Sequence, residues 1–426
     1  MTEPTNSRQS VADWLRYLEQ LHPVAIDLGL TRVDAVRNRM GLKLSCPVIT
    51  IGGTNGKGSV CAFLSTILAA AGYRVGCYTS PHLLQYNERV AVDLQPIADA
   101  DLVKSFNAVE TGRSDTPLTY YEFGTLAAIW HFAQSSLDIA ILEVGLGGRL
   151  DAVNAFDADY AAVVSVDLDH QSYLGDTREK IGFEKAGIYR TGKVAVCGDA
   201  QPPATLIEHA DSIGAELHLI GRDFGFTRQE QQWAFWGRRG KHLSLPFPAL
   251  RGAYQLSNAS TALAILDELR EQLPVGIGDI KRGLLQVEWP ARFQVMPGRP
   301  SVILDVAHNP HAARALAGSL KSMGYYEQTF AVFSMLADKD MASVVAILKD
   351  QIDHWYIAPL TGPRSMSAEV LQQALIAENV PGKVTIFETI SQAYRAACDK
   401  AGENDRIAAF GSFYTVAEVL QTRQSR

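Results

Sequence analysis

A glycine-rich turn with one lysine and one serine is the part of this sequence best suited to chemistry. It consists of Gly53, Thr54, Asn55, Gly56, Lys57, Gly58 and Ser59. Glycines let backbone N–H groups point at an anion, and a following helix N-terminus adds partial positive charge. Lys57 would neutralise the charge of β- and γ-phosphates, and Ser59 could ligate Mg²⁺. The turn therefore predicts a nucleotide phosphate site.

The turn departs from the common phosphate-loop pattern because Gly58 stands between the lysine and the serine hydroxyl. This spacing weakens a generic kinase or GTPase interpretation. A strand–helix turn without any ligand is the simpler alternative. We favour phosphate binding because the lysine, the serine and the flanking elements coincide. Residues 47–51 form an apolar, β-branched run that predicts a buried strand, and residues 60–72 predict a helix.

Charged or polar side chains also end the strands predicted after this turn. Residues 73–80 predict a strand that ends at Ser80, and residues 137–148 predict a buried strand with Glu143 near its carboxyl end. A carboxylate within an apolar strand is costly unless it is paired or binds a metal. His170 follows a further strand, at 160–167, and taken alone it could be structural. Because ligands of α/β proteins bind at the carboxyl ends of strands, we expect a metal site here.

Composition restricts the class of protein. The chain has 426 residues, 47% hydrophobic and 20% charged, which predicts a folded protein of two or three domains. A net charge of −7 argues against a broad nucleic-acid surface. No apolar run reaches the length of a membrane span, and residues 1–10 lack a secretion signal. Five widely spaced cysteines without a C-x-x-C pair predict a reducing cytoplasmic location.

Strand and helix patterns alternate along the chain with one interruption and one boundary. A helix is predicted at 11–21, and residues 222–248 have the aromatic alternation of a small β excursion. Residues 287–301 carry three prolines and a glycine, which marks a domain boundary. After it the alternation restarts without a second glycine-rich lysine turn. We predict an α/β protein with domains at 1–295 and 296–426.

Seven motifs occur in an order that is typical of one enzyme family. They are G-T-N-G-K-G-S at 53–59, T-S-P-H at 79–82, E-V-G-L-G-G-R-L-D-A-V-N at 143–154, D-H at 169–170, E-K-A-G-I at 184–188, A-R-F at 291–293 and D-V-A-H-N-P at 305–310. The chain resembles the folylpolyglutamate synthase and dihydrofolate synthase branch of the Mur-ligase-like, ATP-dependent amide ligases. D-L-G-L at 27–30 and T-Y-Y-E-F at 119–123 are similar to the bifunctional bacterial type.

The resemblance implies a fold and a reaction. The fold is an N-terminal P-loop (Mur-ligase-like) ATPase domain that also binds a pterin, followed by a smaller Rossmann-like domain. The reaction ligates L-glutamate to dihydropteroate and to reduced folates through an acyl phosphate, in folate biosynthesis and one-carbon metabolism. ATP and Mg²⁺ would be required, with two metal sites expected and a role for K⁺ left open. A cytoplasmic monomer without nucleic-acid or membrane partners is expected.

The resemblance also implies roles for individual residues. The catalytic residues would be Lys57, His170 and Lys185, the last of them carbamylated in relatives. The ATP contacts would be residues 53–59 with Val60, Asn258, Arg292 and Asp305. The metal ligands would be Ser59, Ser80, Glu143, His170 and, if carbamylated, Lys185. The pterin contacts would be Asp27, Leu28, Gly29, Leu30, Tyr120, Tyr121, Glu122, Phe123, Leu150, Asp151, Ala152 and Asn154. His308 would stack on adenine or orient the glutamate amine.

Two other classes of function compete with this interpretation. A ligase of the same superfamily could act on a cell-wall or cyanophycin-type precursor, but the first domain itself carries the glycine turn, which argues against the cell-wall enzymes. A nucleotide switch or phosphate-loop kinase is the second alternative. The sequence lacks the N-K-x-D motif with which a GTPase reads guanine. Dependence of phosphate release on glutamate distinguishes the ligases from a switch or kinase.

Overall fold

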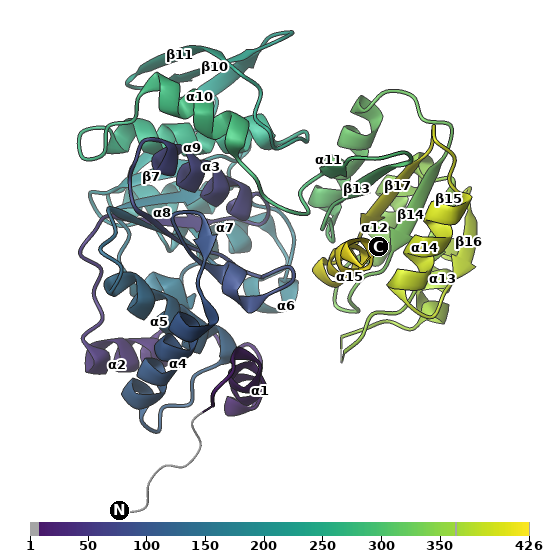
Figure 1. Ribbon diagram of the computed structural model, residues 1–426. Coiled ribbons are helices and arrows are strands. Elements are labelled where there is room, and N and C mark those ends of the chain that lie inside the picture. Colours follow the sequence, from purple (N-terminus) through teal and green to yellow (C-terminus); the bar gives the residue numbers. More distant parts are fainter. Residues whose placement is uncertain (1–7, 363, 426) are drawn as a thin grey trace, which may run out of the picture. The chain divides into compact units, whose positions relative to one another are not determined.

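A computed structural model describes residues 8–362 and 364–425 of the chain (Figure 1). The described residues form two compact units, which we call the first and the second unit. The first unit comprises the chain up to Val166, then His170–Phe247 and Ser257–Val287. The second unit comprises Asp167–Asp169, Pro248–Leu256 and the chain from Glu288 onward.

The first unit is built on an eight-stranded sheet in the order β4-β3-β2-β5-β1-β6-β7-β8. Six of these strands, from β2 to β8 in that order, run parallel, whereas β3 and β4 pair antiparallel at one edge. The strands are β1 (Val48–Gly52), β2 (Val75–Tyr78), β3 (Val90–Val92), β4 (Gln95–Pro96), β5 (Ile139–Glu143), β6 (Tyr160–Val163), β7 (Val194–Cys197) and β8 (Glu216–Leu219).

Helices cover this sheet, and several begin at hydroxyl caps. Ser10 accepts a hydrogen bond from the Asp13 backbone, and Thr119 and Thr177 cap later helices in the same way. The helices are α1 (Val11–Leu21), α2 (Thr31–Met40), α3 (Lys57–Ala70), α4 (Asp99–Arg113), α5 (Tyr120–Ala133), α6 (Gln171–Leu174), α7 (Arg178–Ala186), α8 (Ala204–Ser212), α9 (Gln255–Leu269) and α10 (Ile277–Gln286), with short 3₁₀ helices η1 (Tyr86–Arg89) and η2 (Ala152–Ala155).

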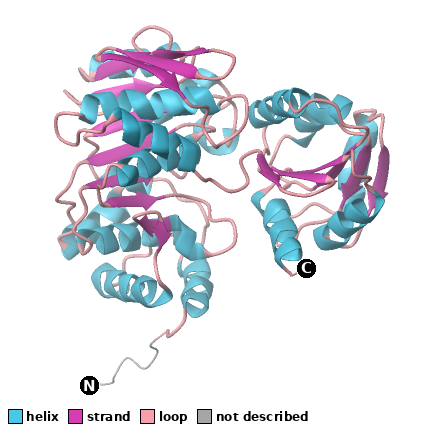
Figure 2. Cartoon of the chain, turned by 45° about the horizontal axis from the view of Figure 1, so that its top comes forward, coloured by secondary structure: helices cyan, strands magenta, loops and turns pink. Residues whose placement is uncertain are grey.

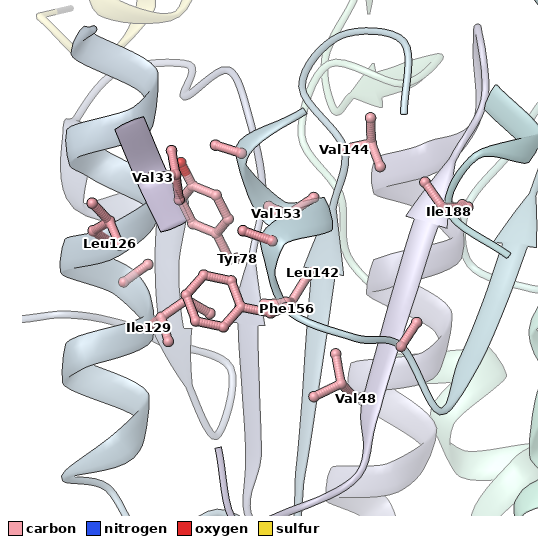
Figure 3. Packing of buried hydrophobic residues seen from close by; sticks show 14 of the residues in the cluster. Val33, Val48, Tyr78, Leu126, Ile129, Leu142, Val144, Val153, Phe156 and Ile188 are labelled. Atoms are coloured by element: carbon pink, nitrogen blue, oxygen red, sulfur yellow. The ribbon is translucent and has the colours of Figure 1, made fainter. Parts of the chain in front are cut away.

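One part of the core of the first unit lies between the sheet and the helices α2 and α5. Figure 3 shows side chains from these elements packed together, among them Val33, Tyr78, Leu126 and Leu142. All four are fully buried. Because both faces of a parallel sheet are covered, its central strands are largely apolar, and β1 and β5 are buried at every position.

A small antiparallel sheet belongs to the first unit as a separate element. Its strands β9 (Gly225–Arg228), β10 (Trp233–Gly237) and β11 (Gly240–Leu245) pair in the order β11-β10-β9. Trp233 and Phe235 are its buried residues on β10. The β excursion predicted at 222–248 is confirmed.

The second unit contains a six-stranded sheet in the order β12-β13-β17-β14-β15-β16, with helices around its strands (Figure 2). All neighbouring strands are parallel except β12 and β13. The elements are β12 (Gln294–Met296), β13 (Ser301–Leu304), α11 (Pro310–Ser322), β14 (Thr329–Phe333), α12 (Met341–Leu348), η3 (Lys349–Gln351), β15 (His354–Ile357), α13 (Ala368–Ala377), β16 (Lys383–Ile386), α14 (Ile390–Lys400), β17 (Arg406–Phe410) and α15 (Phe413–Gln424).

The α/β class and the P-loop domain with a following Rossmann-like domain are confirmed, but the edges of the sheets differ from expectation. The β3–β4 hairpin at 90–96 was not predicted, and β12 lies in the segment taken as a boundary. These strands are only two or three residues long, so their sequences are too short to show a periodic signal. No helix in the described part of the chain is both long and apolar enough to cross a membrane.

Candidate active site

Four neighbouring parallel strands of the first unit bring the predicted residues to one edge of the sheet. In space the order of these strands is β2-β5-β1-β6. Ser80 follows β2, Glu143 ends β5, the glycine loop (residues 53–59) follows β1, and His170 follows β6. Because parallel strands end at the same edge, residues separated by more than a hundred positions in sequence meet there.

The glycine loop is held in its shape by the segment that follows β6. The backbone N–H of Thr54 donates to the Ser165 carbonyl at 2.8 Å, and that of Asn55 donates to Ser165 Oγ at 3.0 Å. Gly53 and Gly56 have φ angles of +143° and +86°, which L side chains rarely adopt. The loop is therefore fixed before any ligand arrives, and its glycines are required by the backbone.

Lys57 begins α3 and turns its ammonium over the loop. Its Nζ donates to the Gly53 carbonyl at 3.1 Å and lies 3.5 Å from the Thr54 carbonyl. Ser59 and Val60 follow in the first turn of α3 and are buried, and the Val60 N–H donates to the Gly56 carbonyl. A phosphate bound by the loop would meet the ammonium and the positive end of the helix dipole together.

Asn258 also contacts the glycine loop, although it lies about two hundred residues further along the chain. It lies near the start of α9 and is buried. A Cβ atom added to Gly56 would lie 2.7 Å from Asn258 Oδ1. The amide therefore packs directly against the loop backbone, and Gly56 leaves the space for it.

Glu143 and Ser80 are adjacent. The Glu143 side chain is 4% exposed, and its Oε2 accepts a hydrogen bond from the Ser80 backbone N–H at 3.0 Å. In the sheet register Glu143 pairs with Ile51, two residues before the glycine loop begins at Gly53. The buried Glu143 carboxylate thus lies between the strand that leads into the glycine loop and the loop that carries Ser80.

Lys185 lies in the last turn of α7 and is 4% exposed. This end of α7 packs against the loop that leaves β5, because a Cβ on Gly148 would lie 3.0 Å from the Lys185 carbonyl. The Arg149 backbone N–H donates to the Glu184 carbonyl at 2.8 Å, and the Arg149 and Glu184 side chains form an ion pair. His170, with a left-handed φ of 51°, begins the neighbouring helix α6.

The predicted pterin residues come from three segments that contact one another. Tyr121 in the first turn of α5 donates from its hydroxyl to Asp151 Oδ1 at 3.2 Å. Asp151 also accepts from the Leu146 and Val153 backbones, and burial raises its pKa to about 6. Asn154 donates to the carbonyls of Arg149 and Gly187. The loop at 150–154 is therefore joined to both α5 and α7.

The side chains of two predicted pterin residues, Glu122 and Phe123, are engaged in contacts that stabilise the first unit. Both carboxylate oxygens of Glu122 accept hydrogen bonds, from Arg32 and from the Thr119 backbone. Phe123 is fully buried against Trp14, with ring centroids 6.0 Å apart. These side chains contribute to the cap and the core of the first unit. Asp27, Leu28, Gly29 and Leu30 form the partly exposed loop before α2, Tyr120 begins α5, and Leu150 and Ala152 flank Asp151.

Three predicted residues belong to the second unit, where they surround the end of β13. Asp305 follows β13, and its oxygens accept from the Phe293 and Ala307 backbones at 2.8 Å each. Burial raises the pKa of Asp305. The Arg292 guanidinium lies 5.0 Å from the ring centroid of Phe413. The His308 ring nitrogen Nδ1 is 2.7 Å from the Val306 carbonyl.

Comparison with known proteins identifies the family. The profile of the Mur ligase, glutamate ligase domain family matches residues 291–413. The dihydrofolate synthase/folylpolyglutamate synthase of Escherichia coli is 45% identical and covers 98% of this chain and 96% of its own length. Its Haemophilus influenzae counterpart is 38% identical over 96% of each chain. This chain belongs to the dihydrofolate synthase/folylpolyglutamate synthase family.

Solved structures of this family have the same fold. E. coli FolC in complex with DHPP and ADP matches with a TM-score of 0.94 and 44% identity, over 99% of each chain. A bifunctional folylpolyglutamate synthase/dihydrofolate synthase with Mn, AMPPNP and L-glutamate bound matches with a TM-score of 0.90 and 43% identity, over 98% of this chain and 99% of its own.

The donor set at the sheet edge fits a divalent cation that also binds phosphate. Among the described residues, no three His, Cys, Asp or Glu side chains gather closely enough to hold a metal. Mg²⁺ at a nucleotide site is held by few protein oxygens, because it keeps waters and binds substrate phosphates. Glu143 offers a buried carboxylate, and Ser59 and Ser80 offer hydroxyl oxygens at adjacent strand ends.

Two arginines that contact candidate site segments were not predicted as site residues from the sequence. Arg89 is buried, donates from Nε to His82 Nδ1 at 2.9 Å and lies 5.0 Å from the Tyr86 ring centroid. Burial, together with the Arg89 charge, lowers the pKa of His82 to about 4. Arg32 contacts Asp27 and Glu122. Both arginines lie in polar stretches, and only the fold shows what they contact.

Proposed function

We propose that this chain ligates L-glutamate to dihydropteroate, giving dihydrofolate, and to reduced folates, giving folylpoly-γ-glutamates. It is an ATP-dependent carboxylate–amine ligase of folate biosynthesis. A carboxylate of the pterin-bearing substrate attacks the γ-phosphate of ATP, and an acyl phosphate and ADP form. The amine of glutamate then displaces phosphate and an amide remains. The observation that supports the proposal is that the glycine loop, Ser80, Glu143 and His170 follow or end four adjacent parallel strands, with the Ser80 N–H donating to Glu143.

The glycine loop and Lys57 bind the triphosphate in this proposal. Backbone N–H groups of residues 53–59, with Val60 and Asn258 beside them, fix the phosphates, and Lys57 offsets charge on the transferred group. Fixed donors need little rearrangement when charge develops, which is the physical source of the rate enhancement. The hydrogen bonds that hold the loop to Ser165 support this assignment.

Mg²⁺, when bound, would withdraw charge from the phosphate that is attacked. Ser59, Ser80, Glu143 and His170 would hold it, and Mn is the ion seen with AMPPNP in a relative. Lys185 would hold a second ion after carbamylation, because the modification replaces an ammonium by a carboxylate. Intact-mass measurement under CO₂ tests this assignment. A bare amine at Lys185 in the metal-saturated enzyme would contradict it.

In this proposal three segments enclose the pterin. They are Asp27, Leu28, Gly29 and Leu30, then Tyr120–Phe123, and then Leu150–Asn154. The hydrogen bond between Tyr121 and Asp151 supports placing the last two segments in one site. Arg292 and Asp305 of the second unit contribute ATP contacts, and His308 orients the glutamate amine or stacks on adenine. We assign ATP and pterin binding to a domain at residues 1–295 and the added glutamate and ATP contacts to a domain at 296–426. The compact units change over slightly earlier, at Glu288.

The remaining features of the proposal are a cytoplasmic monomer, two metal sites and a possible requirement for K⁺. All five cysteines are unpaired, which supports a reducing compartment. Light scattering at assay concentration tests the monomer. Replacing K⁺ by Na⁺ in the assay tests the monovalent cation.

The decisive experiment measures phosphate release from ATP with dihydropteroate and glutamate, and with each left out. We expect release only when both are present, with dihydrofolate formed in equal amount. Tetrahydrofolate replaces dihydropteroate in a parallel assay, and activity with both acceptors establishes both reactions. Phosphate release that does not depend on glutamate would exclude a ligase and favour a kinase or switch.

A further inference from the structure

Arg32 joins two segments that are far apart in sequence. It is the second residue of α2, directly after the loop of Asp27–Leu30. Ninety residues later, Glu122 lies in the first turn of α5. The Arg32 side chain spans the space between this loop and this helix, both of which belong to the first unit.

Every nitrogen of the Arg32 guanidinium donates a hydrogen bond. Nε lies 3.1 and 3.2 Å from the two Glu122 oxygens, and Nη2 lies 2.9 Å from Glu122 Oε1. Nη1 donates to Asp27 Oδ2 at 2.7 Å, and Nη2 donates to the Asp27 carbonyl at 2.7 Å. A planar guanidinium presents its donors in a fixed geometry, so two partners held at once have a fixed separation.

The two partners of Arg32 differ in rigidity. The Glu122 side chain is 5% exposed, and the Thr119 backbone N–H donates to its Oε2 at 2.7 Å in a capping box. The Asp27 side chain is 41% exposed and belongs to a loop. The first turn of α5 is therefore the fixed partner, and Arg32 holds the more exposed loop at 27–30 against it.

We propose that Arg32 is a positioning residue for the pterin-bearing substrate: it sets the distance between the loop at 27–30 and the first turn of α5. This inference rests on the proposed function, which assigns both segments to the pterin. Arg32 itself does not contact the reacting carboxylate in this account. Without the Arg32 hydrogen bonds the loop at 27–30 is no longer held at a fixed distance from the first turn of α5, so binding of the pterin must order the loop and is weakened.

The test is steady-state kinetics of the full chain with Arg32→Gln. We expect KM for dihydropteroate to rise about tenfold or more, with KM for ATP and for glutamate unchanged and kcat within about twofold, since the loop contributes to binding in both ground and transition states. Arg32→Lys can pair with one carboxylate but not hold both in one plane, so its KM should lie between those of the wild type and Arg32→Gln.

Arg39→Gln is the matched control on the same helix. Arg39 ties α2 to the end of α4 through the Gly112 and Arg113 carbonyls, at 2.8 and 2.7 Å, and touches none of the proposed pterin segments. If Arg32 served stability alone, both variants would lower the melting temperature and neither would change KM for dihydropteroate. Such a result overturns the inference, as does an equal rise in KM for ATP.

A double-mutant cycle with Asp27→Asn tests whether Arg32 acts through the loop. We expect the double variant to raise KM for dihydropteroate by less than the two single changes combined, because both substitutions act on the bond from Arg32 Nη1 to Asp27 Oδ2. Additive effects would contradict action through Asp27. The wild-type enzyme distinguishes the proposed function from the proposed role of Arg32. If the wild type is inactive with dihydropteroate, glutamate and ATP, the proposed function is refuted. If the wild type is active and the Arg32 variants have the same KM for dihydropteroate, only the role of Arg32 is refuted. If Arg32→Gln does not fold, Arg32→Lys carries the same comparison.

Discussion

The two units share an alternation of parallel strands and helices but differ in the residues just after their first parallel strand. In the first unit β1 leads into a turn of glycines, where Lys57 lies over the backbone. In the second unit β13 leads into Asp305, whose carboxylate is taken up by two backbone N–H groups. The first strand end carries a cation and backbone donors, whereas the second carries a carboxylate that accepts from the backbone. The same layers of secondary structure thus support different tasks, because chemistry depends on the residues after a strand.

The glycines of the two units make the same contrast. Gly56 has φ +86° and gives space to Asn258 Oδ1, a side chain that could contact a nucleotide. Gly411, which follows β17 in the second unit, has φ +105°, and a Cβ there would lie 2.4 Å from the Ser334 carbonyl. Both positions exclude a side chain. Gly56 does so beside a candidate ligand site, whereas Gly411 does so for close packing of the chain.

The largest effect is expected from Lys57→Met. Removing the charge that faces the transferred phosphate should lower kcat about a thousandfold, the size of loss seen when one oriented charge-stabilising donor is removed. The melting temperature should change by only a few degrees. Phosphate release under saturating substrates is the measurement. Lys321→Met, at an exposed lysine in the last turn of α11, is the control. Equal activity of the two variants would remove the distinction between the units.

Gly56→Ala and Gly411→Ala should separate ligand binding from stability. A left-handed alanine costs about 1–2 kcal/mol in either unit, before any clash is counted. For Gly56→Ala we expect ADP affinity to fall at least about tenfold, because the displaced Asn258 and loop backbone bind the nucleotide in our proposal. For Gly411→Ala we expect mainly a lower urea concentration at the midpoint of unfolding, with ADP affinity little changed. Calorimetric ADP titration and urea unfolding measure the two quantities, and a reversed pattern would contradict the assignment.

A pH dependence of stability is expected at Asp151. Its folded pKa of about 6 exceeds the ordinary aspartate value of 3.8. The folded state therefore binds the proton more tightly, and its contribution to stability, complete below the unfolded pKa, is lost as pH rises through about 6. The free energy of unfolding relative to Asp151→Asn should fall by about 2–3 kcal/mol between about pH 4 and pH 7.

Asp305 provides the comparison in the second unit for this pH dependence. Burial raises its pKa too, so the difference between the wild type and Asp305→Asn should have a slope of the same sign. Chemical denaturation of the variants across this pH range checks both. A difference that rises with pH would show that backbone donors outweigh burial at that carboxylate.

Sequence alone was sufficient for elements with a strong local signal. The strand, glycine turn and helix at 48–70 were predictable because β-branched residues, positive-φ glycines and a helical apolar pattern follow one another. Glu143 stood out because it is one charge in an apolar strand. Their arrival at a single edge followed from the rule for parallel strands rather than from any one residue.

Contacts between distant side chains could not be predicted in this way. Glu122 was assigned to the pterin by motif, but its partner Arg32 lies ninety residues away and no local pattern links them. The same holds for Tyr121 and Asp151, which meet only when α5 packs beside the loop after β5. The hairpin β3–β4 was missed because its strands are too short to show alternation.

The central position of β1 has a consequence for biosynthesis. Its neighbours β5 and β6 begin at Ile139 and Tyr160, roughly ninety and a hundred and ten residues further along the chain. While the ribosome is still producing this stretch, β1 has neither lateral partner, and contacts of such long sequence separation form slowly. A nascent chain that stops before β6 cannot anchor its glycine turn on Ser165. Nucleotide can therefore protect the finished first unit against unfolding and proteolysis, but not its incomplete precursors.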